Sequence, residues 1–415
     1  MECMEICGGR PLNGEVMIQG SKNAALPILA GMILHKGTTV LHNCPKISDV
    51  THMIKILGEL GCTVSWDGNS LCVDAKDVKR ARVPAELGGK MRCSIIFLGA
   101  LLGRMGNARI PYPGGCTIGA RPIDMHMSAL HQMKAEIQEE QEYLTGSCAG
   151  LFGSRIVLRY PSVGATENII LAAVLAEGVT EIRGAAAEPE IMELCRFLND
   201  KGARIHGAGT EHIQIEGVKE LSDSEYDLMP DRIVAGTYLM AAIATRGRCL
   251  LRKAPQEQLE NVIAVAEKMG AVVSKKMEGL LVDGRKAEKC LPLLCTAPHP
   301  GFPTDLQSQV MTALCVAKGE SRIRESVFEA RFRTARELAR MGADIQIVGQ
   351  EAKIRGSMLH GAKVRAPELR GGAALVIAGA AAEGRTWISD CHYIGRGYEN
   401  ICRDMRNLGA DASVK

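Results

Sequence analysis

A short pattern, in which a helix ends and a strand begins, recurs six times along the 415-residue chain. Its copies read LGELGCTVSW, LHQMKAEIQ, FLNDKGARIHG, AEKMGAVVSKK, LARMGADIQI and MRNLGADASVK, anchored at Gly61, Lys134, Gly202, Gly270, Gly342 and Gly409. The anchors are 73, 68, 68, 72 and 67 residues apart, so the chain contains six repeats of about 70 residues. Five anchors are glycine, which predicts a left-handed residue at the end of those five helices.

Each repeat also contains a segment that is apolar almost all round. The six segments are KNAALPILAGMIL, MRCSIIFLGALLGRMG, SVGATENIILAAVLAEG, PDRIVAGTYLMAAIATRG, PTDLQSQVMTALCVAKG and LRGGAALVIAGAAAEG. A helix without a polar face belongs in a protein interior, and β-rich pieces such as HIQIEGV favour strands. We therefore predict an α/β protein, a two-lobed inside-out α/β barrel with helices inside and sheets outside. Residues 21–229 are expected to form the N-terminal lobe, and residues 1–20 with 230–415 the C-terminal lobe, with three repeats in each.

Composition limits the classes of function. Hydrophobic residues make up 46% and charged residues 23% of the chain, and the net charge of +3 suggests neither a nucleic-acid nor a membrane partner. The fifteen cysteines have no framework spacing and the N-terminus MECMEICGGR is no secretory signal, so we expect free thiols and a cytoplasmic location. The chain has no C-x-x-C or H-E-x-x-H motif, so no metal is expected.

The starts of the apolar segments carry charged or polar residues, namely Lys22-Asn23, Arg92, Ser162, Asp231-Arg232, Asp305 and Arg370. A helix N-terminus carries about half a positive charge, so a lysine or arginine there opposes the helix dipole. Such groups are tolerated best when an anion lies between them. The pattern predicts a strongly anionic ligand, with phosphate and carboxylate as candidates, held between the two lobes.

Eight motifs resemble those of a known family: IQGSKNAALPILAG, PGGCTIGARPIDMH, PSVGATENIILAA, AAAEPEI, GAGTEHIQIEGV, PDRIVAGTYL, PHPGFPTDLQSQ and HYIGRGYE. From about residue 10 onward, the chain resembles the UDP-N-acetylglucosamine 1-carboxyvinyltransferases, which are enolpyruvyl transferases. The resemblance implies transfer of enolpyruvate from phosphoenolpyruvate to the 3′-hydroxyl of UDP-N-acetylglucosamine, through a tetrahedral phospholactoyl intermediate that releases phosphate. This is the first committed step of peptidoglycan precursor synthesis. The resemblance also implies that these two small substrates are the partners of the chain, that no cofactor takes part and that no oligomer is required.

The resemblance assigns the chemistry to Cys116, on the glycine-rich loop, and to Asp305, with the active site in the cleft between the lobes. Cys116 would protonate C3 of phosphoenolpyruvate or hold a covalent phospholactoyl or pyruvate adduct, because a thiol on such a loop can reach the substrate. Asp305 would take the proton of the sugar hydroxyl or the later C3 proton. The structural alternative for Asp305 is a helix cap. Which residue handles each proton stays open.

The implied phosphoenolpyruvate site is basic, as a ligand with both a phosphate and a carboxylate requires. Lys22 and Arg121 would face the phosphate, and Arg370 and Arg396 the carboxylate. The whole set is Lys22, Asn23, Arg92, Arg121, Arg370 and Arg396, of which Lys22 and Arg396 are also expected to take part in catalysis. Arg331 in FEARF is a further candidate.

The resemblance also implies a nucleotide-sugar site, made of Asn23, Arg92, Arg121, Pro122, Ile123, Asp124, Ser162, Val163, Gly164, Asp305 and Val327. SVGAT can offer backbone N–H groups at a helix start to the diphosphate. We interpret His126 as structural. For Glu188 and Glu190, a role in the site and a role in the first turn of a helix are equally open.

Four residues depart from the family pattern, namely Ser48, Tyr160, Ala330 and Glu368. They bear on substrate affinity and loop closure more than on the chemistry. Two other functions are considered: a shikimate 3-phosphate enolpyruvyl transferase, against which GCTIGARP argues, and a nucleotide-sugar-binding regulatory paralogue with little turnover. A paralogue of that kind would be expected to lose the thiol, Asp305 or an arginine, and this chain has lost none of them.

Overall fold

The computed structural model describes residues 3–89, 91–114 and 118–415, which divide into two compact units. Unit 1 contains residues 3–19, 118–119 and 230–415, and unit 2 contains residues 20–89, 91–114 and 120–229. Within these residues the strands form six sheets, three in each unit. The predicted sixfold α/β repeat is confirmed.

Each repeat runs from a buried helix to a strand, a second helix and two further strands. In unit 2 the first repeat contains α1 (Lys22–Gly31), η1 (Met32–Leu34), β3 (Thr38–His42), α2 (Ser48–Leu60), β4 (Thr63–Asp67) and β5 (Ser70–Asp74). The second, preceded by α3 (Ala85–Gly88), contains η2 (Arg92–Ile96), α4 (Phe97–Met105), β6 (Asn107–Pro111), α5 (Asp124–Gln132), β7 (Glu136–Glu139) and β8 (Tyr143–Ser147). The third contains α6 (Val163–Ala173), β10 (Val179–Arg183), α7 (Pro189–Asp200), β11 (Arg204–His206) and β12 (His212–Glu216).

Unit 1 repeats the same order. Its first repeat contains α8 (Arg232–Ala244), β14 (Arg248–Arg252), η3 (Glu257–Leu259), α9 (Glu260–Lys268), β15 (Val272–Lys276) and β16 (Gly279–Asp283). The next contains η4 (Thr304–Leu306), α10 (Gln307–Cys315), β18 (Glu320–Arg324), α11 (Arg333–Arg340), β19 (Asp344–Val348) and β20 (Glu351–Arg355). The last contains α12 (Leu369–Ala381), β22 (Arg385–Ser389), η5 (Cys391–Arg396), α13 (Ile401–Asn407) and β23 (Asp411–Val414). The N-terminal strand β1 (Met4–Cys7) completes it by pairing antiparallel with β22 and β23.

A further strand precedes the buried helix in several repeats. The strands β9 (Arg155–Val157), β17 (Leu294–Cys295) and β21 (Lys363–Arg365) pair in parallel with β10, β18 and β22 of their own repeats. The two strands beside the unit boundaries differ. β2 (Asn13–Met17) leads into α1 of unit 2 but pairs with β14 of unit 1, and β13 (Ser224–Asp227) leads into α8 of unit 1 but pairs with β3 of unit 2. Each of the two segments in which the chain passes from one unit to the other therefore forms a strand in the unit that it is about to leave.

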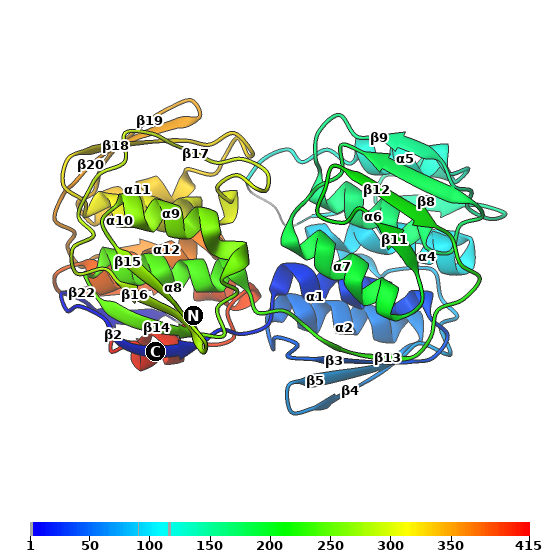
Figure 1. The fold of residues 1–415 in the computed structure, drawn as a ribbon, viewed down its shortest axis with the longest axis horizontal. Coiled ribbons are helices and arrows are strands. Elements are labelled where there is room, and N and C mark those ends of the chain that lie inside the picture. The colour runs from blue at the N-terminus through cyan, green and yellow to red at the C-terminus, as the bar shows by residue number, and fades with distance from the viewer. Residues whose placement is uncertain (1–2, 90, 115–117) are drawn as a thin grey trace. The chain divides into compact units, whose positions relative to one another are not determined.

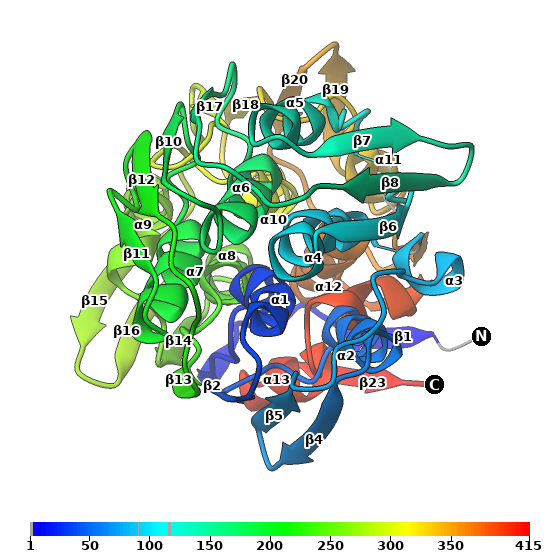
Figure 2. The same cartoon turned by 90° about the vertical axis from the view of Figure 1, so that its right-hand side faces the viewer.

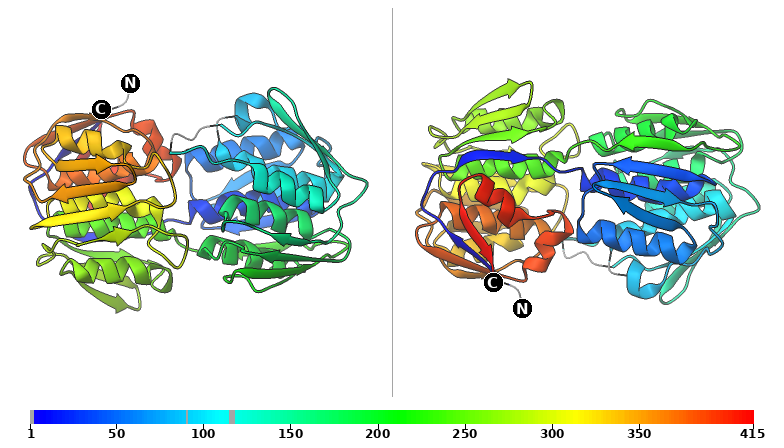
Figure 3. Two further views of the ribbon diagram at one scale, coloured as in Figure 1. Left: turned by 90° about the horizontal axis from the view of Figure 1, so that it is seen from above. Right: turned by 90° about the horizontal axis from the view of Figure 1, so that it is seen from below.

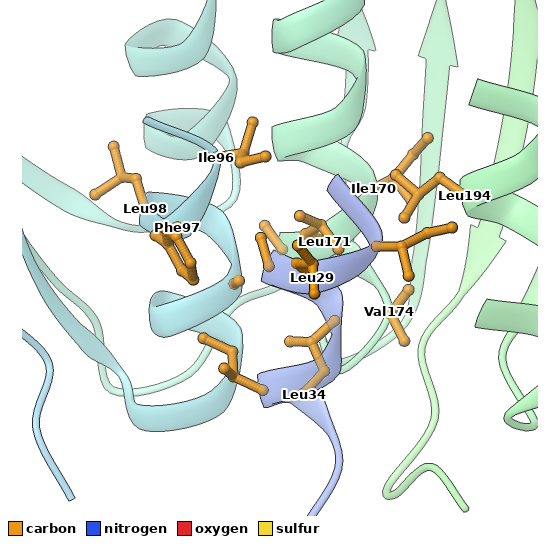
Figure 4. Close-up of a cluster of buried hydrophobic side chains, with 14 of the residues drawn as sticks. Leu29, Leu34, Ile96, Phe97, Leu98, Ile170, Leu171, Val174 and Leu194 are labelled. Carbon is orange, nitrogen blue, oxygen red and sulfur yellow. The ribbon is translucent and has the colours of Figure 1, made fainter. Parts of the chain in front are cut away.

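The apolar helices lie inside each unit and the sheets outside, as predicted. Every residue of α8 and α10 is buried, and α8, α10 and α12 pack against one another in unit 1 (Figure 1). Figure 2 shows α1, α4 and α6 surrounded by the three sheets of unit 2, and Figure 3 shows the sheets from two further sides. Figure 4 shows Leu29 of α1, Phe97 of α4 and Leu171 of α6 in the apolar interior of unit 2.

Gly99 allows α4 and α6 to approach closely. A Cβ atom at Gly99 would lie 2.2 Å from the carbonyl oxygen of Asn168, which excludes any larger residue without movement of a helix. The Gly99 N–H, in the first turn of α4, donates to Oδ1 of Asn168 at 2.7 Å. Asn168 thus satisfies a backbone donor that the helix itself leaves without an acceptor.

All six anchor residues adopt positive φ angles. The five glycines have φ between 92° and 111°, and Lys134, which replaces glycine in the second repeat, has φ 71°. The expectation for the five glycines is confirmed, and the structure shows a left-handed residue at the same place in the second repeat, where glycine is absent.

Replacing Lys134 by glycine is expected to stabilise unit 2 by about 0.5–1 kcal/mol. The left-handed conformation costs a non-glycine residue about 1–2 kcal/mol, and part of that gain is offset by the extra freedom of glycine in the unfolded chain. Urea denaturation measures the change, with Lys134→Ala as the control that retains the Cβ atom. Equal midpoints for the glycine and alanine variants would contradict the prediction.

In the part of the chain that is described, every helix is too short or too polar to span a lipid bilayer.

Candidate functional site

The predicted site residues fall into two groups, one in each unit. Cys116 lies outside the described residues, so its place in the site stays a prediction. Unit 1 contains Asp305, Val327, Arg331, Arg370 and Arg396. Unit 2 contains Lys22, Asn23, Arg92, Arg121, Pro122, Ile123, Asp124, Ser162, Val163 and Gly164.

In unit 1, Asp305 bonds to two buried arginines. Its Oδ1 accepts a hydrogen bond from Nη2 of Arg331 at 2.7 Å, and its Oδ2 accepts one from Nη2 of Arg370 at 2.7 Å. The arginine side chains are 2% and 3% exposed, whereas that of Asp305 is 26% exposed. We call Arg331 and Arg370 the arginine clamp. One carboxylate faces two cations that are shielded from water.

Asp305 does not cap a helix. It lies in η4, directly before α10, and neither element has a side-chain hydrogen bond at its cap position. Asp305 is not the cap residue of either element, and both of its carboxylate oxygens bond to the arginine clamp.

The charge of Arg370 is maintained by its surroundings. Burial disfavours the charged guanidinium, but the carboxylate of Asp305, with smaller effects from Tyr398 and Asp231, outweighs burial and raises the pKa of Arg370 above its usual value. Nη1 of Arg370 has no hydrogen-bond acceptor among the described residues. The clamp thus retains a buried donor that Asp305 does not satisfy.

Glu368 orients the start of the helix that carries Arg370. Its Oε2 accepts from the Arg370 N–H at 2.8 Å and its Oε1 from the Gly371 N–H at 2.6 Å, so Glu368 caps α12. The departure from aspartate at this position therefore keeps a carboxylate that caps the helix.

Glu325 is a supporting residue that sequence reasoning missed. Its side chain is fully buried, and its Oε1 accepts from the N–H groups of Val327 at 2.9 Å and Phe328 at 3.2 Å. Its Oε2 accepts from the Thr304 hydroxyl at 3.0 Å. Glu325 thus fixes the segment with Val327 to the residue that precedes Asp305. Its only sequence signal was its position three residues before the first residue of the FEARF motif.

The cations of unit 2 also have acceptors within their own unit. Lys22, the first residue of α1, forms an ion pair of 3.2 Å with the buried Asp49. The Arg92 guanidinium donates to the carbonyl oxygen of Arg121, and Arg121 has a left-handed backbone with φ 45°. Asp49, which lies in α2, was not among the predicted site residues.

The starts of α5 and α6 lie side by side in unit 2. Asp124, the first residue of α5, pairs with Arg159, and this bond lowers the pKa of Asp124 despite a small opposing effect of burial. Ser162 caps α6, since its hydroxyl accepts from the Ala165 N–H at 3.4 Å. A Cβ atom at Gly164 would lie 3.4 Å from the His126 ring, which shows how closely the two helix starts approach.

His126 is buried beside these starts. Burial lowers the pKa of His126 to about 3, with further lowering by Arg92 and Arg121. Nδ2 of Asn168 lies 3.0 Å from Nδ1 of His126, so the neutral ring accepts at Nδ1 and carries its proton on Nε2. These contacts support a structural role for His126.

Glu167 is a second residue that the sequence reasoning missed. Burial, with smaller effects of Glu190 and Glu188, raises the pKa of Glu167 to about 8, and Arg121 only partly opposes them. Glu188 precedes α7 and Glu190 lies in its first turn. The carboxyl group of Glu167 is therefore protonated at neutral pH, next to two other acidic residues.

A Glu167→Gln variant is expected to lose less stability than the unaltered chain when the pH is raised from 5 to 8.5. The folded state binds a proton at Glu167 up to about pH 8, while the unfolded carboxyl group loses it near pH 4.5, so stability falls as the pH rises through this window. The expected difference is about 4 kcal/mol, since each unit of pKa difference corresponds to about 1.4 kcal/mol. Urea denaturation at several pH values measures it, with the exposed Glu216→Gln as the control. Identical pH dependence in both variants would contradict the prediction.

In the ranges that the structure describes, no group of three or more histidine, cysteine, aspartate or glutamate side chains is arranged to hold a metal ion.

Comparison with known proteins identifies the family. The family model described as EPSP synthase (3-phosphoshikimate 1-carboxyvinyltransferase) matches residues 6–405. UDP-N-acetylglucosamine 1-carboxyvinyltransferase 2 of Caldanaerobacter subterraneus subsp. tengcongensis is 49% identical over 408 residues, which cover 98% of each chain. UDP-N-acetylglucosamine 1-carboxyvinyltransferase of Nitratidesulfovibrio vulgaris is 45% identical over 411 residues, which cover 99% of this chain and 98% of the relative.

Solved structures share the fold over the full length. The enolpyruvyl transferase NikO from Streptomyces tendae has a TM-score of 0.89 at 26% identity and covers 100% of this chain, which covers 99% of NikO. EPSP synthase from Acinetobacter baumannii has a TM-score of 0.78 at 17% identity, with full coverage of both chains, and shows the fold alone. The chain therefore belongs to the enolpyruvyl transferases of the EPSP synthase family, among the members named UDP-N-acetylglucosamine 1-carboxyvinyltransferase.

Proposed function

We propose that this chain transfers enolpyruvate from phosphoenolpyruvate to the 3′-hydroxyl of UDP-N-acetylglucosamine and releases phosphate. The observation that carries the proposal is the arginine clamp, because two desolvated guanidinium groups on one carboxylate form a site that a small carboxylate ligand fits. The relatives named for this reaction, at 45–49% identity over nearly the whole chain, support the choice of substrates.

Two sets of predicted cations would bind phosphoenolpyruvate, one for each of its anionic groups. In unit 1, Arg370 and Arg396 would hold its carboxylate, and Arg331, as the partner of Arg370 in the clamp, joins them. In unit 2, Lys22 and Arg121 would hold the phosphate. Asp49 now neutralises Lys22, so the incoming phosphate would share or replace that partner.

UDP-N-acetylglucosamine would bind at the start of α6 and along the segment before α5. The free N–H groups of Val163 and Gly164 suit a diphosphate oxygen, because they lie at the positive end of a helix. Asn23, Pro122, Ile123, Asp124 and Val327 would complete its site.

The reaction would proceed by addition and elimination. A proton from Cys116 or another acid adds to C3 of phosphoenolpyruvate, which makes C2 electrophilic. The sugar 3′-oxygen bonds to C2 as its proton passes to Asp305, giving the tetrahedral phospholactoyl intermediate. Loss of a C3 proton and of phosphate from C2 then restores the double bond. A sulfur bond from Cys116 to C2 would account for a covalent phospholactoyl or pyruvate adduct.

This chemistry would need no metal and no organic cofactor, because its steps are proton transfers, formation of one bond at C2 and loss of phosphate from C2. It places the chain at the first committed step of peptidoglycan precursor synthesis, in the cytoplasm, with small molecules as its partners.

Phosphate release from phosphoenolpyruvate, with and without UDP-N-acetylglucosamine, tests the proposal. We expect sustained release only when the nucleotide sugar is present. Release that depends instead on shikimate 3-phosphate would assign the sister activity, and binding of UDP-N-acetylglucosamine without any release would favour a regulatory paralogue.

A further inference from the structure

We propose that Asp305 occupies, in the ligand-free protein, the place of the substrate carboxylate, so that phosphoenolpyruvate must displace Asp305 from the arginine clamp before transfer begins. The inference rests on the proposed function, because it takes the ligand of the clamp to be a carboxylate. It adds that the base and the substrate compete for the same two guanidinium groups.

Accessibility is the first argument for displacement. Arg331 and Arg370 are almost fully shielded, whereas a quarter of the Asp305 side chain is in contact with solvent. An incoming carboxylate therefore meets Asp305 before it meets either guanidinium. Both carboxylate oxygens of Asp305 already bond to the clamp, one to each arginine, which is the arrangement that a ligand carboxylate would adopt.

The unsatisfied donor is the second argument. Nη1 of Arg370 is buried and has no acceptor in the described part of the protein. A buried donor without an acceptor is unfavourable, so Asp305 satisfies the clamp incompletely. A ligand carboxylate is not tethered to the backbone of η4 and can sit deeper, where it would satisfy this donor as well. Replacement of Asp305 by a ligand carboxylate would therefore leave the charge at the clamp almost unchanged and would satisfy one more buried donor, which makes the exchange favourable.

The exchange has a consequence for catalysis. While Asp305 bonds to two guanidinium groups it is a poor base, because nearby positive charges stabilise the deprotonated form. Once displaced, it can accept a proton from the sugar hydroxyl. Binding of phosphoenolpyruvate would thereby both fill the clamp and make the base available. Arg331 and Arg370 are positioning residues for Asp305 in the absence of substrate and substrate ligands in its presence.

Calorimetric titration of the full chain with phosphoenolpyruvate tests the inference, in a Cys116→Ser background that prevents covalent reaction. Asp305→Asn is expected to bind phosphoenolpyruvate about tenfold more tightly or better, because the clamp is no longer occupied by a charged competitor. Asp283→Asn is the matched control, since it removes a carboxylate that pairs with Arg285 elsewhere in unit 1. Its affinity should equal that of the background protein.

Inorganic phosphate, which has no carboxylate, serves as the second probe. Its affinity should change much less than that of phosphoenolpyruvate in Asp305→Asn. An equal gain for both probes would reflect the change in charge alone and would overturn the exchange. Unchanged or weaker binding of phosphoenolpyruvate by Asp305→Asn would overturn it too, while turnover by the unaltered chain would leave the proposed function standing. No binding of phosphoenolpyruvate by any of the proteins would overturn the inference, and it would overturn the proposed function as well if the unaltered chain also shows no turnover.

A structure of the unaltered chain with phosphoenolpyruvate gives a test that does not depend on the folding of a variant. We expect the ligand carboxylate between Arg331 and Arg370, with Asp305 no longer bonded to either. A ligand bound while both Asp305 bonds persist would overturn the inference.

Discussion

An Asp305→Asn variant is expected to turn over about 10²–10⁴-fold more slowly than the unaltered chain, because the amide cannot accept the proton of the sugar hydroxyl. The loss should appear in kcat. The KM for phosphoenolpyruvate should not rise, since the arginine clamp remains and loses its internal competitor. Steady-state phosphate release at varied phosphoenolpyruvate concentration measures both constants.

The same substitution leaves two buried guanidinium groups without a carboxylate, so it should also lower stability. Circular dichroism and thermal unfolding separate this effect from catalysis. Asp283→Asn, which removes the exposed pair with Arg285, should leave turnover unchanged. A folded Asp305→Asn variant within tenfold of full turnover would contradict the assignment of Asp305 as the base.

Replacing Cys116 by serine is expected to lower turnover by about 10²-fold or more. A serine hydroxyl is a much weaker acid and nucleophile than a thiol, so it can neither protonate C3 efficiently nor hold a stable adduct at C2. Mass spectrometry of the intact protein after incubation with phosphoenolpyruvate should show an adduct in the unaltered chain and none in the variant.

Cys295→Ser is the control for the thiol, because Cys295 is an exposed free cysteine in unit 1. It should retain full turnover and the adduct. Full turnover by Cys116→Ser would contradict the proposed chemistry of the loop cysteine.

The repeat could be predicted from the sequence because every copy has to meet the same two physical requirements. A helix that is apolar on every side must be buried, and a helix that ends against a strand needs a left-handed residue. The second of these requirements holds even at Lys134, where the sequence has no glycine and the backbone is still left-handed. The predicted lobe boundaries already assign β2 to unit 1 and β13 to unit 2, but their pairing with β14 and β3 was not predicted, since the pattern of a strand does not reveal which neighbour it pairs with.

The site was harder to predict from the residues. Asp305, Arg331 and Arg370 are far apart in the sequence and meet only in the folded unit, where α10, which follows η4, packs against α12, so no spacing rule joins them. Arg331 was only a secondary candidate, yet it bonds to Asp305 as closely as Arg370 does. Glu325 and Glu167 were missed because a glutamate in the sequence is expected to be exposed, and burial becomes visible only in the folded chain.

Identification of the product tests the central claim most directly. The unaltered chain is incubated with phosphoenolpyruvate and UDP-N-acetylglucosamine, and the nucleotide sugar is analysed by mass spectrometry and proton NMR. The account predicts an enolpyruvyl ether at the 3′-oxygen of UDP-N-acetylglucosamine, formed in proportion to the phosphate released. Recovery of unmodified UDP-N-acetylglucosamine under conditions where both substrates bind would contradict it.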